Sequence, residues 1–67
     1  MKDVTVYDGG SVQMVTPETP EAREWIDRYL DLEGWQWMGN AFAVEPRYLP
    51  DLLGQMVGDG LDVELPE

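Results

Sequence analysis

The first apolar residues of the chain alternate with polar ones, as in a β-hairpin. The two alternating segments flank Asp8-Gly9-Gly10, and glycine supplies the positive φ that a tight turn requires. Because successive side chains of a strand point to opposite faces of a sheet, one face is expected to be buried. That face would hold Val4, Val6, Val12 and Met14.

Farther along, apolar residues recur at three- and four-residue spacing, as in an amphipathic helix. The preceding segment 16–21 twice combines a threonine suited to capping, a proline suited to the first turn, and a glutamate suited to the positive end of the helix dipole. We therefore expect a helix from Pro20 to Leu32, with Gly34 as its left-handed cap. Its buried stripe would be Ala22, Trp25, Ile26, Tyr29 and Leu30.

A second hairpin is predicted around Gly39-Asn40, because a two-residue loop with glycine first is typical of a type II′ turn. In that register Trp37 pairs with Phe42 on one face of the sheet. Trp35 would pair with Val44 on the same face. Packing in the core thus accounts for both tryptophans without a ligand.

The last third of the chain predicts a helix and a strand. Pro46 and Pro50 bracket the start of the helix, which the apolar spacing extends to about Val57. Its stripe would be Leu49, Leu52, Leu53, Met56 and Val57. Segment 61–65 alternates strictly, which predicts a half-buried strand with its aliphatic residues inward and its two acids outward.

The predicted order of elements is ββαββαβ, which indicates an α+β fold. We expect a small mixed or mostly antiparallel sheet with both helices packed on one face. Because a chain of 67 residues suffices for one hydrophobic core, residues 1–67 are expected to form a single acidic domain.

The absence of cysteine and histidine excludes disulfides, zinc fingers and the usual nucleophile–imidazole arrangements. A catalytic carboxylate pair would need an enclosed site, whereas the acids here fall on predicted polar faces. The acids of segment 59–64 lack the twelve-residue spacing of a calcium loop. We therefore expect a protein that is not an enzyme and that holds no metal or cofactor.

Fourteen acidic residues against four basic ones give a net charge of −10. Such a charge repels nucleic acid and anionic lipid and attracts basic surfaces, so we expect neither a direct nucleic-acid partner nor a membrane partner. The N-terminal residues resemble neither a signal peptide nor a membrane anchor. Absence of cysteine fits a reducing compartment. A cytoplasmic monomer is therefore predicted.

Acidic residues concentrate on the first predicted helix and in the last third of the chain. On that helix, Glu24, Asp27 and Asp31 would form an anionic row about 10 Å long. Pairing with Arg23 and Arg28 would alternatively make this row an ordinary solvated face. Residues 48–67 contain no basic residue. The expected partner-binding residues are Glu21, Glu24, Asp27, Asp31, Asp59, Asp62 and Glu64.

Several segments together resemble small proteins of phages and mobile elements. These segments are Gly10-Ser11, Thr16-Pro17, Ala22 with Trp25, Trp37-Met38-Gly39, Ala43-Val44-Glu45-Pro46-Arg47-Tyr48 and Asp59-Gly60-Leu61. In size and acidity the chain is also similar to anti-CRISPR proteins, several of which are acidic domains that block DNA binding by CRISPR effector complexes. Anti-CRISPR proteins share no universal motif, so this similarity assigns no functional residue.

The resemblance implies a phage-encoded inhibitor that acts in the cytoplasm of the infected bacterial host. Its acidic surface would mimic DNA and bind a basic DNA-binding surface on a CRISPR effector subunit, with type I complexes preferred. The residues leave two alternatives open. One is an antitoxin or immunity-type protein that neutralises a basic toxin, and the other is an acidic adaptor module.

Overall fold

The computed structural model describes residues 2–32 and 34–65, with Trp35 described only through its backbone. The predicted order ββαββαβ is confirmed. The elements are β1 (Val4–Asp8), β2 (Gln13–Pro17), α1 (Pro20–Tyr29), β3 (Trp37–Met38), β4 (Ala41–Val44), α2 (Leu49–Gly58) and β5 (Val63–Glu64). Two short 3₁₀ helices, η1 (Gly34–Gln36) and η2 (Pro46–Tyr48), precede β3 and α2.

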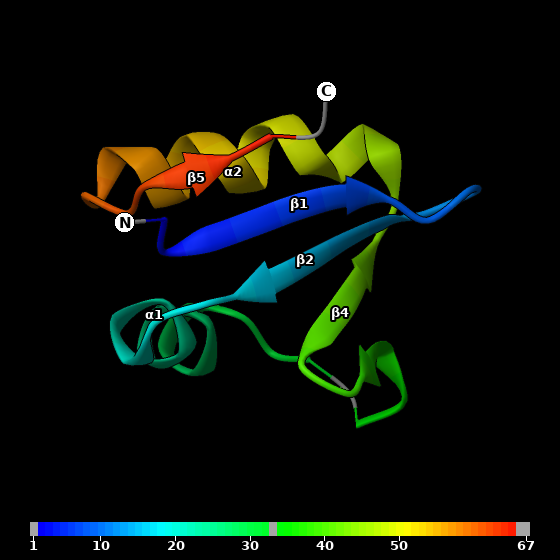
Figure 1. Ribbon diagram of the computed structural model, residues 1–67, viewed down its shortest axis with the longest axis horizontal. Helices are drawn as coiled ribbons and strands as arrows, with labels where there is room; N and C mark the ends of the chain where they lie inside the picture. The colour runs from blue at the N-terminus through cyan, green and yellow to red at the C-terminus, as the bar shows by residue number, and fades with distance from the viewer. Residues whose placement is uncertain (1, 33, 66–67) are drawn as a thin grey trace.

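The strands form one mixed sheet in the order β3-β4-β2-β1-β5. All neighbours are antiparallel except β1 and β5, which are parallel. Figure 1 shows β1 and β5 side by side, with α2 alongside them. Helix α1 lies near the C-terminal end of β2, which it follows in the chain. The α+β class and the mixed sheet are therefore as predicted.

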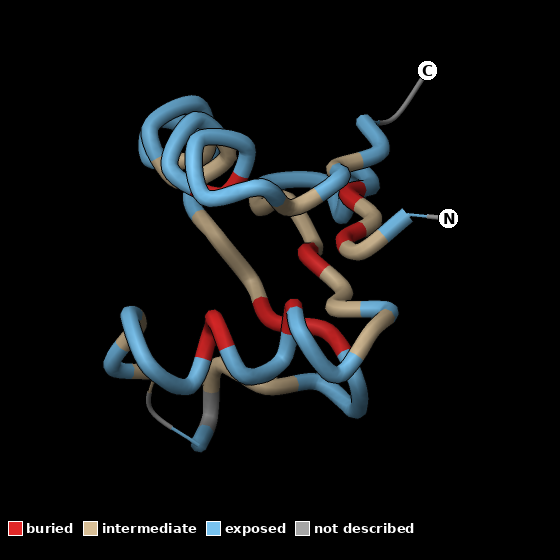
Figure 2. The backbone as a smooth tube through the Cα atoms, turned by 90° about the vertical axis from the view of Figure 1, so that its left-hand side faces the viewer, coloured by how far each residue is buried: buried red, intermediate tan, exposed pale blue. Residues whose placement is uncertain are grey.

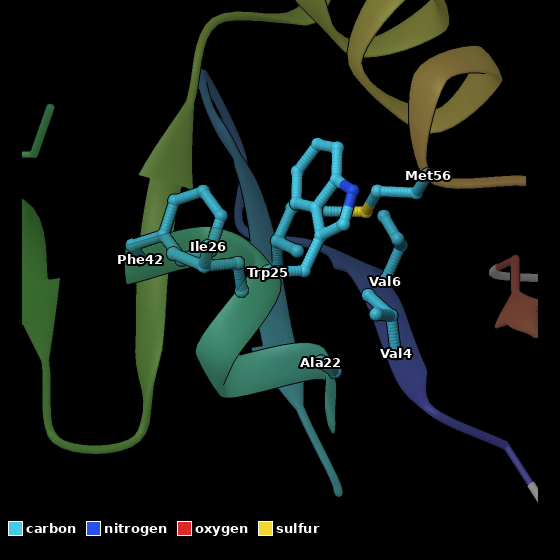
Figure 3. Packing of buried hydrophobic residues seen from close by; sticks show 8 residues of the cluster. Val4, Val6, Ala22, Trp25, Ile26, Phe42 and Met56 are labelled. Atoms are coloured by element: carbon cyan, nitrogen blue, oxygen red, sulfur yellow. The ribbon is translucent and has the colours of Figure 1, made fainter. Parts of the chain in front are cut away.

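The hydrophobic core lies on one face of this sheet. Val6, Val15 and Phe42 face one another across β1, β2 and β4, so their side chains share a face. Trp25 of α1 and Met56 of α2 belong to the same buried cluster (Figure 3). Figure 2 shows the buried parts of both helices turned toward the strands. Both helices thus cover the same face, as expected.

The first hairpin differs from the prediction in the phase of its second strand. Its turn uses the four residues 9–12 instead of the predicted three, Asp8-Gly9-Gly10, because Gly9 N donates to Val12 O at 2.9 Å and Asp8 Oδ1 accepts from Gly10 N at 2.8 Å. The longer turn moves the residues of β2 to the opposite face from the one predicted. The prediction that Met14 is buried with Val6 is therefore wrong, and Val15 takes that place.

Helix α1 begins as predicted and ends early. Thr19 caps it by accepting from Ala22 N at 3.2 Å. The helix stops at Tyr29 because Leu30 adopts an extended conformation, with φ −113° and ψ 133°. Gly34 lies in η1 and is not among the glycines with positive φ, so the predicted left-handed cap is wrong. Tyr29 is exposed, contrary to its place in the expected stripe.

The second hairpin has the predicted loop. Trp37 pairs with Phe42 and their rings are 5.2 Å apart, nearly edge to face. Gly39 has φ +69° and Asn40 does not have a positive φ, the combination that a type II′ turn requires. The strand is shorter than expected, since Trp35 belongs to η1. Its predicted pairing with Val44 is therefore absent.

Helix α2 ends in a Schellman motif. Gly60 has φ +95°, Gly60 N donates to Val57 O, and Leu61 N donates to Met56 O, both at 3.0 Å. This turn directs the chain into β5, where Val63 lies opposite Val4. Two expected core positions, Val57 and Leu65, are instead exposed. For Leu65 the reason is the short β5, which ends at Glu64.

Two matched glycine substitutions test this ending. Gly60→Ala should lower the free energy of unfolding by about 1 to 2 kcal/mol, because an L-residue is strained at positive φ. Gly54→Ala should raise it by about 0.5 to 1 kcal/mol, since Gly54 is an exposed position inside α2 where an added Cβ meets nothing within 4 Å. Urea unfolding checks both, and a stability loss from Gly54→Ala would contradict the described helix.

Candidate functional site: an acidic end where α1 begins and α2 ends

A hydrogen bond from Trp25 to Asp59 joins the two helices. Trp25 is buried in α1 with 8% exposure, and its Nε1 donates to Asp59 Oδ2 at 2.7 Å. Asp59 is the C-cap of α2, so the bond links the middle of one helix to the end of the other. Because one partner is a carboxylate, this hydrogen bond is stronger than a neutral one. The charge of Asp59 is thereby held in a fixed position.

Acidic side chains gather around this bond. Glu21, Glu24 and Asp59 line a shallow cleft of about 360 Å³. The cleft is also lined by Trp25, Arg28, Tyr29 and Leu61. Arg28 Nη2 contacts Glu24 Oε1 at 2.8 Å, so a single cation faces three carboxylates here. The structure thus brings together three of the residues that the sequence predicts for partner binding.

Asp3 connects this region to the sheet, a role that sequence patterns did not indicate. Its Oδ2 accepts from Asp62 N at 2.9 Å, and its Oδ1 accepts from Thr19 Oγ1 at 2.8 Å. Asp62 in turn pairs with Lys2 at 3.3 Å. The capping role of Thr19 was predictable, but the acceptor of its hydroxyl proton depends on the tertiary fold. Asp3 therefore holds the start of α1 and the approach to β5 together.

These hydrogen bonds lower the pKa of the Asp3 carboxyl. The backbone N–H of Asp62 is the larger cause and the Thr19 hydroxyl the second, because both stabilise the carboxylate form. Partial desolvation opposes them and is the smaller effect.

We call the resulting surface the acidic end. It comprises Asp3, Glu18, Glu21, Glu24, Asp59 and Asp62, with Lys2 and Arg28 among them. Glu18 is included because its backbone N–H donates to Asp3 O at 2.7 Å, while its side chain accepts from Thr5 at 3.3 Å. In Figure 1, α1, the end of α2 and the beginning of β5 all lie on the left of the molecule.

The other predicted binding residues lie elsewhere. Asp27 pairs with Arg23 at 3.3 Å, and the Arg23 guanidinium is 4.3 Å from the ring centroid of Trp37, on the side of α1 toward β3. Asp31 follows the end of the helix, so the predicted helical row from Glu24 through Asp27 to Asp31 is not formed. Glu64 lies opposite Thr5, on the sheet face that the helices do not cover.

The charge of the described residues is strongly one-sided. All four basic side chains pair with a carboxylate, at Lys2–Asp62, Arg23–Asp27, Arg28–Glu24 and Arg47–Glu45. These pairs are exposed and add little stability. Within the part of the chain that the structure describes, the remaining acids form no ion pair with a basic side chain. A negative field of this kind attracts basic surfaces and accelerates their association.

Within the described residues, no group of three acidic side chains is arranged to hold a metal ion. None of the described helices is long and apolar enough to cross a membrane. The carboxylates of the cleft are exposed to solvent. The acidic end can therefore bind cationic groups of a partner, and it offers no enclosed site for acid–base chemistry.

Asp3→Asn tests the role of the lowered pKa. A carboxylate whose pKa falls on folding stabilises the protein above its ordinary pKa of 3.8 and loses this effect as the pH falls through the folded-state pKa. The variant should therefore be less stable than the parent at neutral pH, and the gap should narrow at about pH 3. Urea midpoints of both proteins at the two pH values give the gap, and a pH-independent gap would contradict the role.

Comparison of the chain with protein-family models, with curated protein sequences and with solved structures finds no match. What the acidic end does is therefore inferred from its geometry and charge.

Proposed function

We propose that the protein is an inhibitor that presents the acidic end to a basic DNA-binding surface, with a CRISPR effector complex as its target. The observation that carries the proposal is the anchoring of carboxylates from separate segments. Asp3, Asp59 and Asp62 each take part in a hydrogen bond or ion pair with another element. The charges are thus fixed on a rigid scaffold, as phosphates are on a duplex.

Fixed charges favour binding because less conformational freedom is lost when the complex forms. A DNA-binding surface spends much of its affinity on phosphates, which occur at about one charge per 1.7 Å of the helix axis. Carboxylates held at one end of a compact domain would present negative charge to such a surface in place of phosphates. The uneven distribution of charge supports a role in binding, since solubility needs a net charge of only about 2 to 8.

The target class is supported by the similarity in size and acidity to anti-CRISPR proteins. In that role the protein would be phage-encoded and would act in the cytoplasm of the host. Its partner would be a basic effector subunit, with type I complexes preferred. Neutralisation of a basic toxin uses the same electrostatics and is the alternative that the experiment below separates.

The test compares two double variants in a DNA-binding assay with a type I effector complex. Glu21→Lys with Glu24→Lys changes the acidic end, and Asp27→Lys with Asp31→Lys changes acids that lie outside the cleft, toward the end of α1. Each acid-to-lysine change adds two charges, so both double variants move the net charge from −10 to −6. Each pair also breaks one arginine ion pair.

The parent protein should displace labelled target DNA, less effectively as salt rises. The Glu21 and Glu24 variant should be weaker by about tenfold or more, equivalent to ~1.4 kcal/mol, while the control stays near the parent. Equal losses in both variants would mean that net charge alone acts. DNA binding undisturbed by the parent protein would reject the effector as target and leave toxin neutralisation as the function to test.

A further inference from the structure

A second candidate binding surface lies between the helices, away from the acidic end. Near Asp59 the helices are tied together through Trp25 and Met56. At the end of α1 and the start of α2 they leave a half-open groove of about 440 Å³. We call this space the interhelical groove. Its lining includes Leu30, Leu32, Phe42, Val44, Tyr48 and Leu52.

The surface of the groove is mainly apolar. Phe42 is fully buried at its base, whereas Leu30, Leu32, Val44 and Leu52 are only partly buried, and Tyr48 is 55% exposed. Leaving such side chains in water forgoes about 25 cal/mol for each Å² of apolar surface. Contiguous apolar surface bordered by polar residues is typical of interaction sites. The groove is therefore suited to an apolar ligand group.

The margin of the groove is acidic. Glu45 lines it, Asp31 lies between two lining leucines, and Asp51 precedes Leu52; all three are exposed. The nearby cation is Arg47, which contacts Glu45 at 2.9 Å and lies 4.8 Å from the ring centroid of Tyr48. Glu45 is thus paired with Arg47, whereas Asp31 and Asp51 adjoin lining residues in the sequence and form no ion pair with any of the four basic side chains. An occupant with positive charge beside its apolar side chains would complement this margin.

We propose that the interhelical groove binds a basic amphipathic segment of a partner protein. A free apolar molecule in a half-open groove would keep part of its apolar surface in contact with water. An amphipathic helix avoids this, because its apolar side enters the groove and its polar side faces the solvent. The volume is within the range of pockets that accept small ligands or anchoring side chains. Large apolar residues of the segment fill the groove, and its lysines or arginines face Asp31, Glu45 and Asp51.

This site is independent of the DNA-mimicking role, because it uses other residues and depends on apolar burial. Binding here should consequently survive salt concentrations that abolish contacts made only by exposed charges.

The test titrates the labelled protein with a helical peptide of leucine and lysine about four turns long. Two peptides of the same length serve as controls, one with glutamate in place of lysine and one with serine in place of leucine. The leucine–lysine peptide should bind and shift the NMR signals of Leu30, Leu52 and Tyr48. Both controls should bind at least about tenfold more weakly, a difference of ~1.4 kcal/mol.

Two tyrosine variants locate the binding site. Tyr48 in the groove and Tyr29 in the acidic cleft are 55% and 58% exposed, so replacing either with alanine removes little buried surface, and Tyr29→Ala also removes a ring contact with Trp25 at 5.1 Å. Tyr48→Ala should weaken peptide binding about fivefold or more, as expected of an aromatic anchor, and Tyr29→Ala should not. The opposite result, or equal binding of the serine–lysine peptide, would overturn the proposal by placing the peptide at the acidic end. The Glu21→Lys, Glu24→Lys variant should still bind the peptide even if it fails to displace DNA.

Discussion

The hydrogen bond between Trp25 and Asp59 determines how the two candidate surfaces are arranged. The indole ring lies in the core beside Met56, and its N–H holds the carboxylate at the end of α2. One side chain thus stabilises the core and positions a surface charge. This bond joins the helices at the end of α2, whereas the interhelical groove lies where α1 stops and α2 starts, so the acidic end and the groove are separate surfaces.

Core formation on a single face explains why so much of this small domain is available for binding. A chain of 67 residues buries a limited share of its surface. Here two helices cover one side of the sheet, and the other side is left to residues such as Tyr7 and Thr5. Charge is distributed just as unevenly, since each of the four cations is already paired. Uncompensated acids and partly exposed leucines therefore both remain at the surface of a domain whose small core covers one face of the sheet.

Local sequence patterns predicted the order of the elements correctly, but they predicted the strand register and the helix ends less well. The loop of the second hairpin was predicted correctly from Gly39, because a two-residue turn leaves little choice of register. In the first hairpin the Asp8 carboxylate accepts a hydrogen bond from Gly10 N, and the turn is longer than predicted. The resulting one-residue shift placed Val15 in the core. Periodicity also could not locate the end of α1, which an extended Leu30 sets before any glycine. Among the acids, sequence indicated which helix carries them, but only the tertiary fold shows which ones meet.

The parallel pairing of β1 with β5 has a consequence for how the protein is made. Asp3 and Asp62 are hydrogen-bonded across a sequence separation of 59 residues. A ribosome must therefore translate and release almost all of the intervening chain before this edge of the sheet can close. Contacts of such long range cost loop entropy before they contribute stability, which slows folding. Until β5 docks, β1 presents an unpaired edge, and nascent chains are most open to proteases and to mispairing during this interval.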